Sequence, residues 1–339
     1  ETIMALKGLK TGLMAATAAA AVFAGAQGAT AQEGKSITTV VKISGIPWFD
    51  RMKTGVDMYA EQHPEMDIEQ VGPASADSAQ QLQIVQDLVA RGVDALAVVP
   101  MDPAILEGVL KRAMDRGIVV VTHEADNQKN TMVDVEAFDN AEYGAALNER
   151  LAECMGGEGK WTTFVGSLGS RTHMQWVGAG EENAKQYEGM ELVDPNNESF
   201  DDAQGTYEKA KEILRKHPDI KGFQTSAGND VLGVGRAIEE AGLAGKVCLV
   251  GTGLPNPSAA YLDSGAITAI GFWDPQKAGM AMNSVATKLL AGEEITDGMD
   301  LGVEGYGNVS VRDGAGDGLL VIGNGMVLAD KDTYEEHLF

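Results

Sequence analysis

Short runs rich in β-branched residues alternate with segments of helical periodicity along most of this chain, and this alternation constrains its fold more than any other feature. Residues 39–43 predict a strand, and Met52, Val56 and Tyr59 then form one apolar face of a helix. Four apolar residues in a row at 118–121 suit a strand that is buried on both faces. Repeated strand–helix units are typical of a parallel sheet covered by helices, so the sequence predicts an α/β fold.

The alternation restarts near residue 161, which indicates two lobes with a similar order of elements. We expect two doubly wound parallel-sheet lobes joined by a three-segment hinge, with the chain crossing near residues 138–139, 272–274 and 301–304. The first lobe would then comprise residues 32–138 plus 274–303, and the second residues 139–273 plus 304–339. His63 and His217 each precede a proline before a strand, so we interpret both as helix-end residues.

The N-terminal segment has the composition of a secretory signal peptide. Lys7 and Lys10 precede a short apolar run at 13–25, and Ala29-Thr30-Ala31 provides a small-residue cleavage site. A membrane anchor is the alternative, but a span needs roughly 20 apolar residues and no stop-transfer charges follow. We therefore expect residues 1–31 to be a signal peptide that directs the protein to the periplasm.

Charge and cysteine content exclude several classes of protein. The chain has 26 Lys and Arg against 50 Asp and Glu, a formal net charge of -24, which disfavours nucleic acid and anionic lipid as partners. Two cysteines, Cys154 and Cys248, form neither a disulfide scaffold nor a metal cluster. Export would permit them to pair, and the sequence leaves open whether they form one bridge or two buried thiols.

Ligands of open α/β sheets bind beyond the carboxyl ends of the strands, so we examined the residues that follow each predicted strand. Trp48 and Phe49 follow the first strand at the entry to a helix. They form either a hydrophobic staple under that helix or a platform for the apolar face of a sugar ring. Lys42 is either a solvated strand residue or a hydrogen-bond donor that points inward.

Further strand ends carry polar and aromatic side chains. Glu124 is suited to accept hydrogen bonds from two neighbouring hydroxyls, although His123 and Glu124 could instead form a general base. Asn229 either caps a helix or binds a hydroxyl ligand, and Trp273 and Asp274 again combine a ring with a carboxylate. Asp102, which precedes a proline, is expected to be a helix N-cap.

Sequence motifs for catalysis or cofactor binding are missing. The chain has no G-x-G-x-x-G, G-x-S-x-G or H-E-x-x-H motif. The segment 154–161 departs from a P-loop, because Cys154 occupies the first glycine position and Trp161 the Ser/Thr position. No set of Cys and His residues has metal-ligand spacing. We therefore expect a protein that is not an enzyme, with no cofactor and no metal.

Four short segments, at 91–96, 113–118, 228–230 and 271–274, carry a family resemblance. With them the mature chain resembles the periplasmic sugar-binding proteins of bacterial ABC importers, of the ribose-binding-like type. Gly271-Phe272-Trp273-Asp274, together with Trp48-Phe49, is most similar to the subgroup that binds rhamnose and autoinducer-2.

The resemblance implies a set of ligand contacts. Trp48 and Phe49 would stack on the ligand ring, and Glu124 occupies a position where the family usually has aspartate. His173 or Gln175 would stand at the family's arginine or Asp-Gln position, with Arg171 displaced. The complete predicted site comprises Lys42, Trp48, Phe49, Glu124, Arg171, His173, Gln175, Phe200, Asn229, Trp273 and Asp274.

The resemblance also implies a function. We expect an exported monomeric receptor that closes over a monosaccharide or related polyol and delivers it to an ABC permease with its ATPase. A receptor for an autoinducer-2-like signal molecule is the first alternative. A repressor-type transcription regulator would need a basic helix-turn-helix where this chain has the signal peptide, and a secreted sugar-modifying enzyme would need a catalytic motif.

Overall fold

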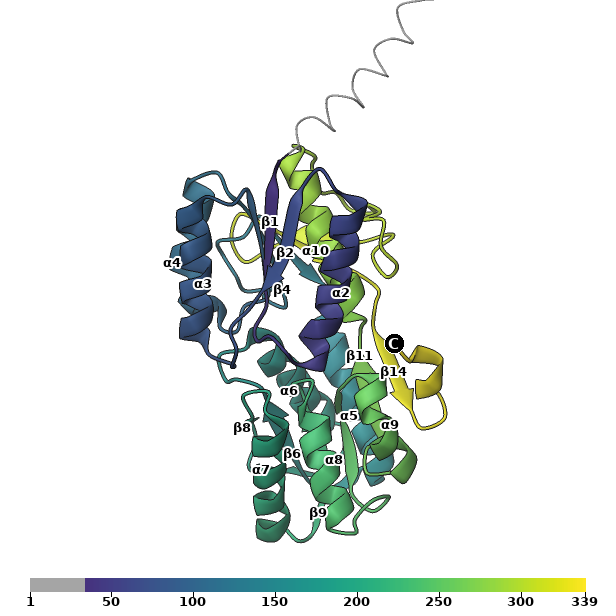
Figure 1. The fold of residues 1–339 in the computed structure, drawn as a ribbon. Coiled ribbons are helices and arrows are strands. Elements are labelled where there is room, and N and C mark those ends of the chain that lie inside the picture. Colours follow the sequence, from purple (N-terminus) through teal and green to yellow (C-terminus); the bar gives the residue numbers. More distant parts are fainter. Residues whose placement is uncertain (1–33) are drawn as a thin grey trace, which may run out of the picture.

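The computed structural model describes residues 34–339, which form two α/β lobes arranged end to end (Figure 1). The predicted signal peptide lies outside the described residues. Each lobe contains one largely parallel sheet with helices on both faces, so the predicted fold class is confirmed. Within residues 34–339, no helix combines the length and the apolar character needed to cross a bilayer.

The sheet of the first lobe has the strand order β12-β13-β5-β4-β3-β1-β2. All its neighbouring strands are parallel except β12, which runs antiparallel to β13. Its strands are β1 (Ser36–Val40), β2 (Asp67–Val71), β3 (Ala95–Val98), β4 (Val119–His123), β5 (Val133–Glu136), β12 (Ser310–Asp313) and β13 (Leu319–Ile322).

The sheet of the second lobe has the order β14-β11-β10-β9-β6-β7, and the short strand β8 pairs with β6. Its edge strand β14 runs antiparallel to β11, and the other pairs are parallel. Its strands are β6 (Glu158–Val165), β7 (Gly189–Leu192), β8 (Asn197–Glu198), β9 (Ile220–Thr225), β10 (Cys248–Thr252), β11 (Ala269–Phe272) and β14 (Val327–Asp330).

Helices cover both faces of each sheet. They are α2 (Pro47–Gln62), α3 (Ser78–Arg91), α4 (Pro103–Asp115), α5 (Asn140–Met155), α6 (Arg171–Ala184), α7 (Ala203–Lys216), α8 (Asp230–Glu240), α9 (Pro255–Ser264), α10 (Pro275–Leu290) and the 3-10 helix η1 (Tyr334–His337). In the first lobe α3 and α4 bury their apolar faces on one side of the sheet, while α2 and α10 cover the other side (Figure 1).

Several helix ends follow from local sequence. The Asp102 carboxylate accepts a hydrogen bond from the Ala104 N–H at 2.9 Å, which confirms that Asp102 is the N-cap of α4. His63 and His217 are the C-caps of α2 and α7, as predicted. The Asp102 cap begins α4 shortly after the carboxyl end of β3, on the side of the first lobe that faces Gly169 of the second lobe.

The chain crosses between the lobes in three segments: between β5 and α5, between β11 and α10, and between β13 and β14. The predicted third crossing near 301–304, and with it the assignment of 304–323 to the second lobe, was wrong. Strand β13 pairs with β5 of the first lobe, with Leu319 opposite Val133 and Ile322 opposite Glu136. The sequence could not show this pairing, because the apolar run Leu319–Ile322 is suited to a strand of either sheet and its partner β5 lies far away in the sequence.

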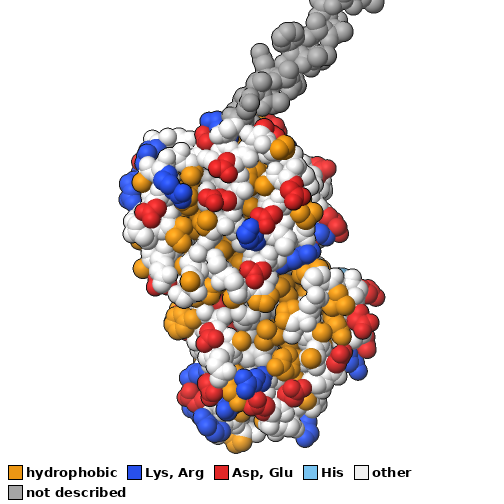
Figure 2. Space-filling model, in the orientation of Figure 1, with side chains coloured by type: hydrophobic (Ala, Val, Ile, Leu, Met, Phe, Trp, Pro, Cys, Tyr) orange, Lys and Arg blue, Asp and Glu red, His pale blue; other side chains and the backbone are white. Residues whose placement is uncertain are grey.

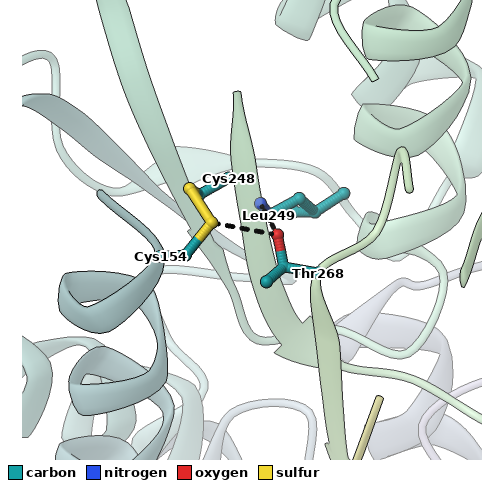
Figure 3. Close-up of a disulfide and its surroundings, with 4 residues drawn as sticks. All are labelled: Cys154, Cys248, Leu249 and Thr268. Carbon is teal, nitrogen blue, oxygen red and sulfur yellow. Dashed lines mark hydrogen bonds between the residues drawn. A yellow bond between two sulfur atoms is a disulfide. The ribbon is translucent and has the colours of Figure 1, made fainter. Parts of the chain in front are cut away.

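A disulfide joins Cys154 near the end of α5 to Cys248 at the start of β10, with a Cα–Cα distance of 6.0 Å (Figure 3). Thr268 lies beside it, with its hydroxyl 3.6 Å from the Cys154 sulfur and accepting a hydrogen bond from the Leu249 N–H. The bridge settles the pairing that the sequence left open. It lies at the amino end of β10, opposite the strand end that faces the first lobe.

The surface carries mixed charges. On the face shown in Figure 2, acidic side chains are scattered over both lobes among basic ones, and hydrophobic side chains gather near the junction of the lobes and on the second lobe. Among residues 34–339, no group of three or more His, Cys, Asp or Glu side chains is arranged to hold a metal ion.

Candidate functional site

A cavity lies between the two lobes at the carboxyl ends of their strands. It is small, with a volume of about 20 Å³, which is room for about one water molecule. Its walls come from the loops after β1, β4, β8, β9 and β11, from the end of β10 and from the first turns of α2 and α6. The lining residues are Lys42, Trp48, Phe49, Glu124, His173, Trp176, Asp201, Ser226, Gly228, Thr252 and Trp273.

Six residues of the predicted site line this cavity. Trp48, Phe49, Lys42 and Glu124 come from the first lobe, His173 comes from α6 of the second lobe, and Trp273 lies in the second crossing segment. The two lobes are in contact here, since a Cβ placed on Gly228 would lie only 3.2 Å from the Trp48 ring. Trp48 therefore faces the loop that precedes Asn229, as the interpretation of these residues as one site requires.

Three indole rings form the aromatic walls. The Trp48 and Trp273 rings meet edge to face at 4.6 Å, and the Trp176 ring lies 5.7 Å from Trp273 at 73°. Phe138 and Tyr143 pack behind Trp273, and the Trp176 indole N–H donates to the Asn140 side chain at 2.7 Å. These contacts hold the rings in place, so the cavity has rigid apolar walls.

The two charged side chains from the first lobe neutralise each other. Lys42 Nζ lies 2.5 Å from Glu124 Oε2, and both side chains are almost completely buried. Glu124 has a φ of 57°, in the left-handed region, and its carbonyl accepts a hydrogen bond from the Thr172 hydroxyl of the second lobe. Glu124 is therefore held both by an ion pair within its lobe and by a contact across the cleft.

The two histidines near the cavity are neutral. Burial lowers the pKa of His123 and places the pKa of His173 well below its usual range. His173 Nδ1 accepts a hydrogen bond from the Gly166 N–H at 3.1 Å, so its proton lies on Nε2. His123 Nδ1 lies 2.5 Å from the Val135 carbonyl and its Nε2 lies 3.7 Å from Glu124 Oε1.

The second lobe contributes two neighbouring carboxyl groups. Asp201 lines the cavity, and its carboxylate accepts a hydrogen bond from the Asn229 N–H at 3.1 Å. Asp230 lies behind it, fully buried, and accepts hydrogen bonds from the Ala227 N–H and the Thr206 hydroxyl. Burial raises the pKa of Asp201 to about 6, and burial together with Asp201 raises the pKa of Asp230 to about 7.

Two polar atoms of the cavity wall lack hydrogen-bond partners. The Ser226 hydroxyl and the Trp273 indole nitrogen are both buried, and neither has a partner within residues 34–339. An unpaired buried polar group destabilises a protein by roughly 1–3 kcal/mol. Both atoms are therefore available to form hydrogen bonds with a polar ligand.

Arg171, Gln175 and Asn229 are not among the residues that line the cavity, contrary to prediction. Arg171 Nε donates to the Asp126 carboxylate at 2.8 Å, and Gln175 donates to the same carboxylate. Asn229 donates from its side chain to the Asp201 carbonyl at 3.0 Å, and it makes no side-chain cap to α8. Arg171 and Gln175 therefore join the two lobes, and Asn229 positions Asp201, because their side-chain donors are already bonded to these acceptors.

Phe200 and Asp274 also lie outside the cavity. Phe200 has a φ of 54° and is 54% exposed on the outside of the second lobe. Asp274 is the N-cap of α10 and forms a bidentate ion pair with Arg51 at 2.8 and 2.9 Å. It lines a separate cavity of about 330 Å³ on the hinge side of Trp273, together with Lys277 and Glu304.

The sequence reading missed five lining residues. Thr252 is the last residue of β10, and Ser226 and Gly228 follow β9, so the strand-end rule alone could have found them. Asp201 is adjacent to the predicted Phe200, and Trp176 lies one residue after Gln175. A shift of one residue changes which side chain faces the cleft, and no periodicity in these loops fixes that choice.

Known proteins resemble this chain in sequence and in fold. A family model described as a periplasmic binding protein domain matches residues 37–294. The D-ribose/D-allose-binding protein of Pseudomonas aeruginosa is 29% identical over 272 residues, which cover 77% of this chain and 84% of that protein.

Two solved structures share the fold. The LsrB protein of Clostridium saccharobutylicum in complex with AI-2 has a TM-score of 0.82 at 22% identity, over 90% of this chain and 100% of that one. An ABC transporter solute-binding protein of Clostridium phytofermentas with bound L-rhamnose also has a TM-score of 0.82, at 20% identity, over 90% and 98% of the two chains.

Proposed function

The chain belongs to the periplasmic binding protein domain family, and from this premise we propose that it is the solute-binding component of an ABC importer for a monosaccharide or related polyol. It acts as a monomer and delivers its ligand to a membrane permease with a cytoplasmic ATPase. The relative from Pseudomonas aeruginosa, which is a D-ribose/D-allose-binding protein, supports the ligand class. The net charge of -24 favours a small-molecule partner over nucleic acid.

The observation that carries this proposal is the composition of the interlobe cavity. Trp48 and Trp273 offer ring faces that can cover the C–H face of a sugar. Ser226 Oγ and Trp273 Nε1 are buried polar atoms to which hydroxyl groups can hydrogen bond. Apolar walls with a few converging polar groups are typical of a site for a small polar ligand.

We propose that the lobes open to admit the ligand, because the cavity of about 20 Å³ is smaller than a sugar ring. A ligand that touches both lobes stabilises the closed arrangement through its contacts there. A wrong sugar would leave a buried group such as Ser226 unpaired, which weakens binding by roughly 1–3 kcal/mol.

We propose that the ligand is released unchanged. Thr172 is committed to the Glu124 carbonyl, and the Glu124 carboxylate is paired with Lys42. The neutral His123 keeps its Nδ1 on a backbone carbonyl. This arrangement supports hydrogen bonding to a ligand and offers no base with an adjacent nucleophile among the described residues.

An autoinducer-2-like signal molecule is the second candidate ligand. The structure of LsrB in complex with AI-2 has the same TM-score against this chain as the rhamnose-bound protein. Because likeness of fold does not select a ligand, the two candidates require a direct comparison.

Thermal shift measurements with pentoses, hexoses, deoxysugars, polyols and autoinducer-2, followed by calorimetry of the best ligands, test this proposal. We expect a sugar or polyol to bind, and Trp48→Ala to weaken it at least tenfold through loss of the ring contact. Phe200→Ala, at an exposed aromatic position on the outside of the second lobe, is the control and should leave affinity unchanged. Binding of autoinducer-2 alone would select the second candidate, and equal affinity of Trp48→Ala and wild type would refute the site.

We also propose that residues 1–31 direct export and are removed. The N-terminal sequence of the protein recovered from the periplasm of an expressing cell should begin near Gln32. Recovery of an uncleaved protein from the cytoplasm would contradict this.

A further inference from the structure

On the basis of the proposed function, we infer that the ligand carries a protonated amine, so that this protein binds an amino sugar or amino polyol, and that Asp201 holds the ammonium group. The inference depends on the balance of charge in the cavity and on the aromatic walls around it.

The cavity has an excess of one carboxylate. Of the described residues that line it, Lys42, Glu124 and Asp201 bear charge, and the buried His173 is neutral. Lys42 and Glu124 compensate each other at 2.5 Å. Asp201 is therefore the carboxylate in excess: the charge of Lys42 reaches it, but Lys42 forms its ion pair with Glu124.

The surroundings of Asp201 accentuate this imbalance. Its carboxylate accepts one backbone N–H, from Asn229, and the Asp230 carboxyl lies behind it. Within the described part of the chain neither Asp201 nor Asp230 forms an ion pair, and Arg171 is bound to Asp126 instead. Burial is the largest cause of the raised pKa of both groups; the charge of Lys42 only partly opposes it at Asp201, and the charge of Asp201 adds to it at Asp230.

An ammonium group would restore the balance. A charge-assisted hydrogen bond to a carboxylate is roughly twice as strong as one between neutral groups. A neutral sugar hydroxyl could also donate to Asp201, but it would leave the buried negative charge uncompensated.

The aromatic walls favour a cation as well. Trp48, Trp176 and Trp273 line the cavity at steep angles to one another, with the Trp48 and Trp176 rings 4.6 Å and 5.7 Å from Trp273. Indole faces attract an ammonium group within about 6 Å, and sites built from several aromatic rings are a common way to bind ligand ammonium groups. A net negative site with three indoles therefore discriminates an amine from the hydroxyl it replaces.

Calorimetry with matched pairs tests this inference. The pairs are D-glucose with D-glucosamine, D-galactose with D-galactosamine, D-mannose with D-mannosamine, and scyllo-inositol with scyllo-inosamine, all at pH 7. We expect the amine of at least one pair to bind at least tenfold more tightly than its neutral partner. The N-acetyl derivative of a preferred hexosamine, which has no charge, should lose that advantage.

Two variants locate the effect. Asp201→Asn should reduce the preference for the amine at least tenfold, whereas Asp202→Asn, which changes the adjacent N-cap of α7 outside the cavity, should preserve it. If Asp201→Asn fails to fold, the comparison of each amine with its neutral partner on the wild-type protein still tests the inference. Tighter binding of the neutral member in every pair that binds would overturn the inference and leave the proposed function intact, whereas no binding by any sugar, polyol or amine would overturn both.

Discussion

Trp273 connects the ligand cavity to the hinge. It is the first residue after β11, in the segment where the chain leaves the second lobe, and it lines both the ligand cavity and the cavity on the hinge side. Its ring contacts Trp48 of the first lobe and Trp176 of the second. In the function that we propose, a ligand that shifts this ring acts directly on a crossing segment, so Trp273 would link ligand binding to the hinge.

Buried carboxyl groups make stability depend on pH. An aspartate in an unfolded chain titrates near pH 4, whereas burial and Asp201 raise the pKa of Asp230 in the folded protein to about 7. The folded state then binds the proton more tightly, so the stabilisation is complete below about pH 4 and is lost as pH rises to about 7. Burial acts in the same direction on Asp134 and Glu136.

Asp230→Asn should remove one such contribution. Relative to wild type, we expect the variant to gain about 2–3 kcal/mol of unfolding free energy between pH 5 and pH 8, measured by urea denaturation at unit steps. Asp57→Asn, at an exposed position on α2, is the control for loss of one carboxylate and should follow wild type. Parallel curves for Asp230→Asn and wild type would show that Asp230 is already ionised at pH 5.

Individual site residues could be predicted where a strand end fixed their position. Lys42, Trp48 and Glu124 were found in this way, and the structure brings them to one cavity. Arg171 and Gln175 could not be placed correctly, because their partner Asp126 belongs to the other lobe. The sequence shows which residues carry donors but not which acceptor across the cleft is nearest.

At the scale of elements, α6 depends on close packing with α5. A Cβ placed on Gly144 of α5 would lie 2.3 Å from the Trp176 carbonyl oxygen of α6. The absence of a side chain at Gly144 therefore allows the two backbones to approach. Because His173 and Trp176 of α6 line the interlobe cavity, this contact also sets the geometry of that cavity.

Gly144→Ala should accordingly impair both stability and binding. The added methyl group must push α6 away, and overpacking of this kind destabilises by roughly 1–3 kcal/mol; we also expect at least a threefold loss of ligand affinity. Gly178→Ala is the matched control, since Gly178 lies on α6 with open space around it. It should stabilise the protein by roughly 0.5–1 kcal/mol and leave affinity unchanged. Urea denaturation measures the stability of both variants, and calorimetry measures their ligand affinity. If the two variants changed stability and affinity alike, the close contact at Gly144 would not be the cause.

Elements with clear periodicity could be predicted, and pairings that depend on distant residues could not. The alternation of strands and helices led to the α/β fold, and the family resemblance drawn from four short segments is confirmed by the match over residues 37–294. The third crossing was misplaced because β13 pairs with β5, a choice made by contacts remote in sequence. The Cys154–Cys248 bridge was undecided for the same reason.

At the scale of the whole molecule, hydrogen bonds across the cleft join the two lobes, and apart from Glu124 the residues that form them do not line the interlobe cavity. The amino end of α6 in the second lobe holds the loop after β4 in the first lobe. Arg171 and Gln175 both donate to the Asp126 carboxylate, and the Thr172 hydroxyl donates to the Glu124 carbonyl. The lobe opening that we propose would break these contacts, so they favour the closed state over the open one.

Loss of these contacts should therefore weaken binding by reducing the closed population, since apparent affinity scales with the fraction of binding-competent protein. A partly exposed ion pair contributes about 0.2–1 kcal/mol, so Arg171→Ala should weaken binding up to about fivefold, and Asp126→Ala, which also frees Gln175, should weaken it more. Small-angle scattering should show a larger radius of gyration for the ligand-free variants.

Lys53→Ala, which breaks an exposed ion pair within α2, is the control and should change neither the affinity nor the radius of gyration. In the double variant the effects of Arg171→Ala and Asp126→Ala should be less than additive, because both remove the same contact; full additivity would mean that the ion pair across the cleft does not contribute to closure.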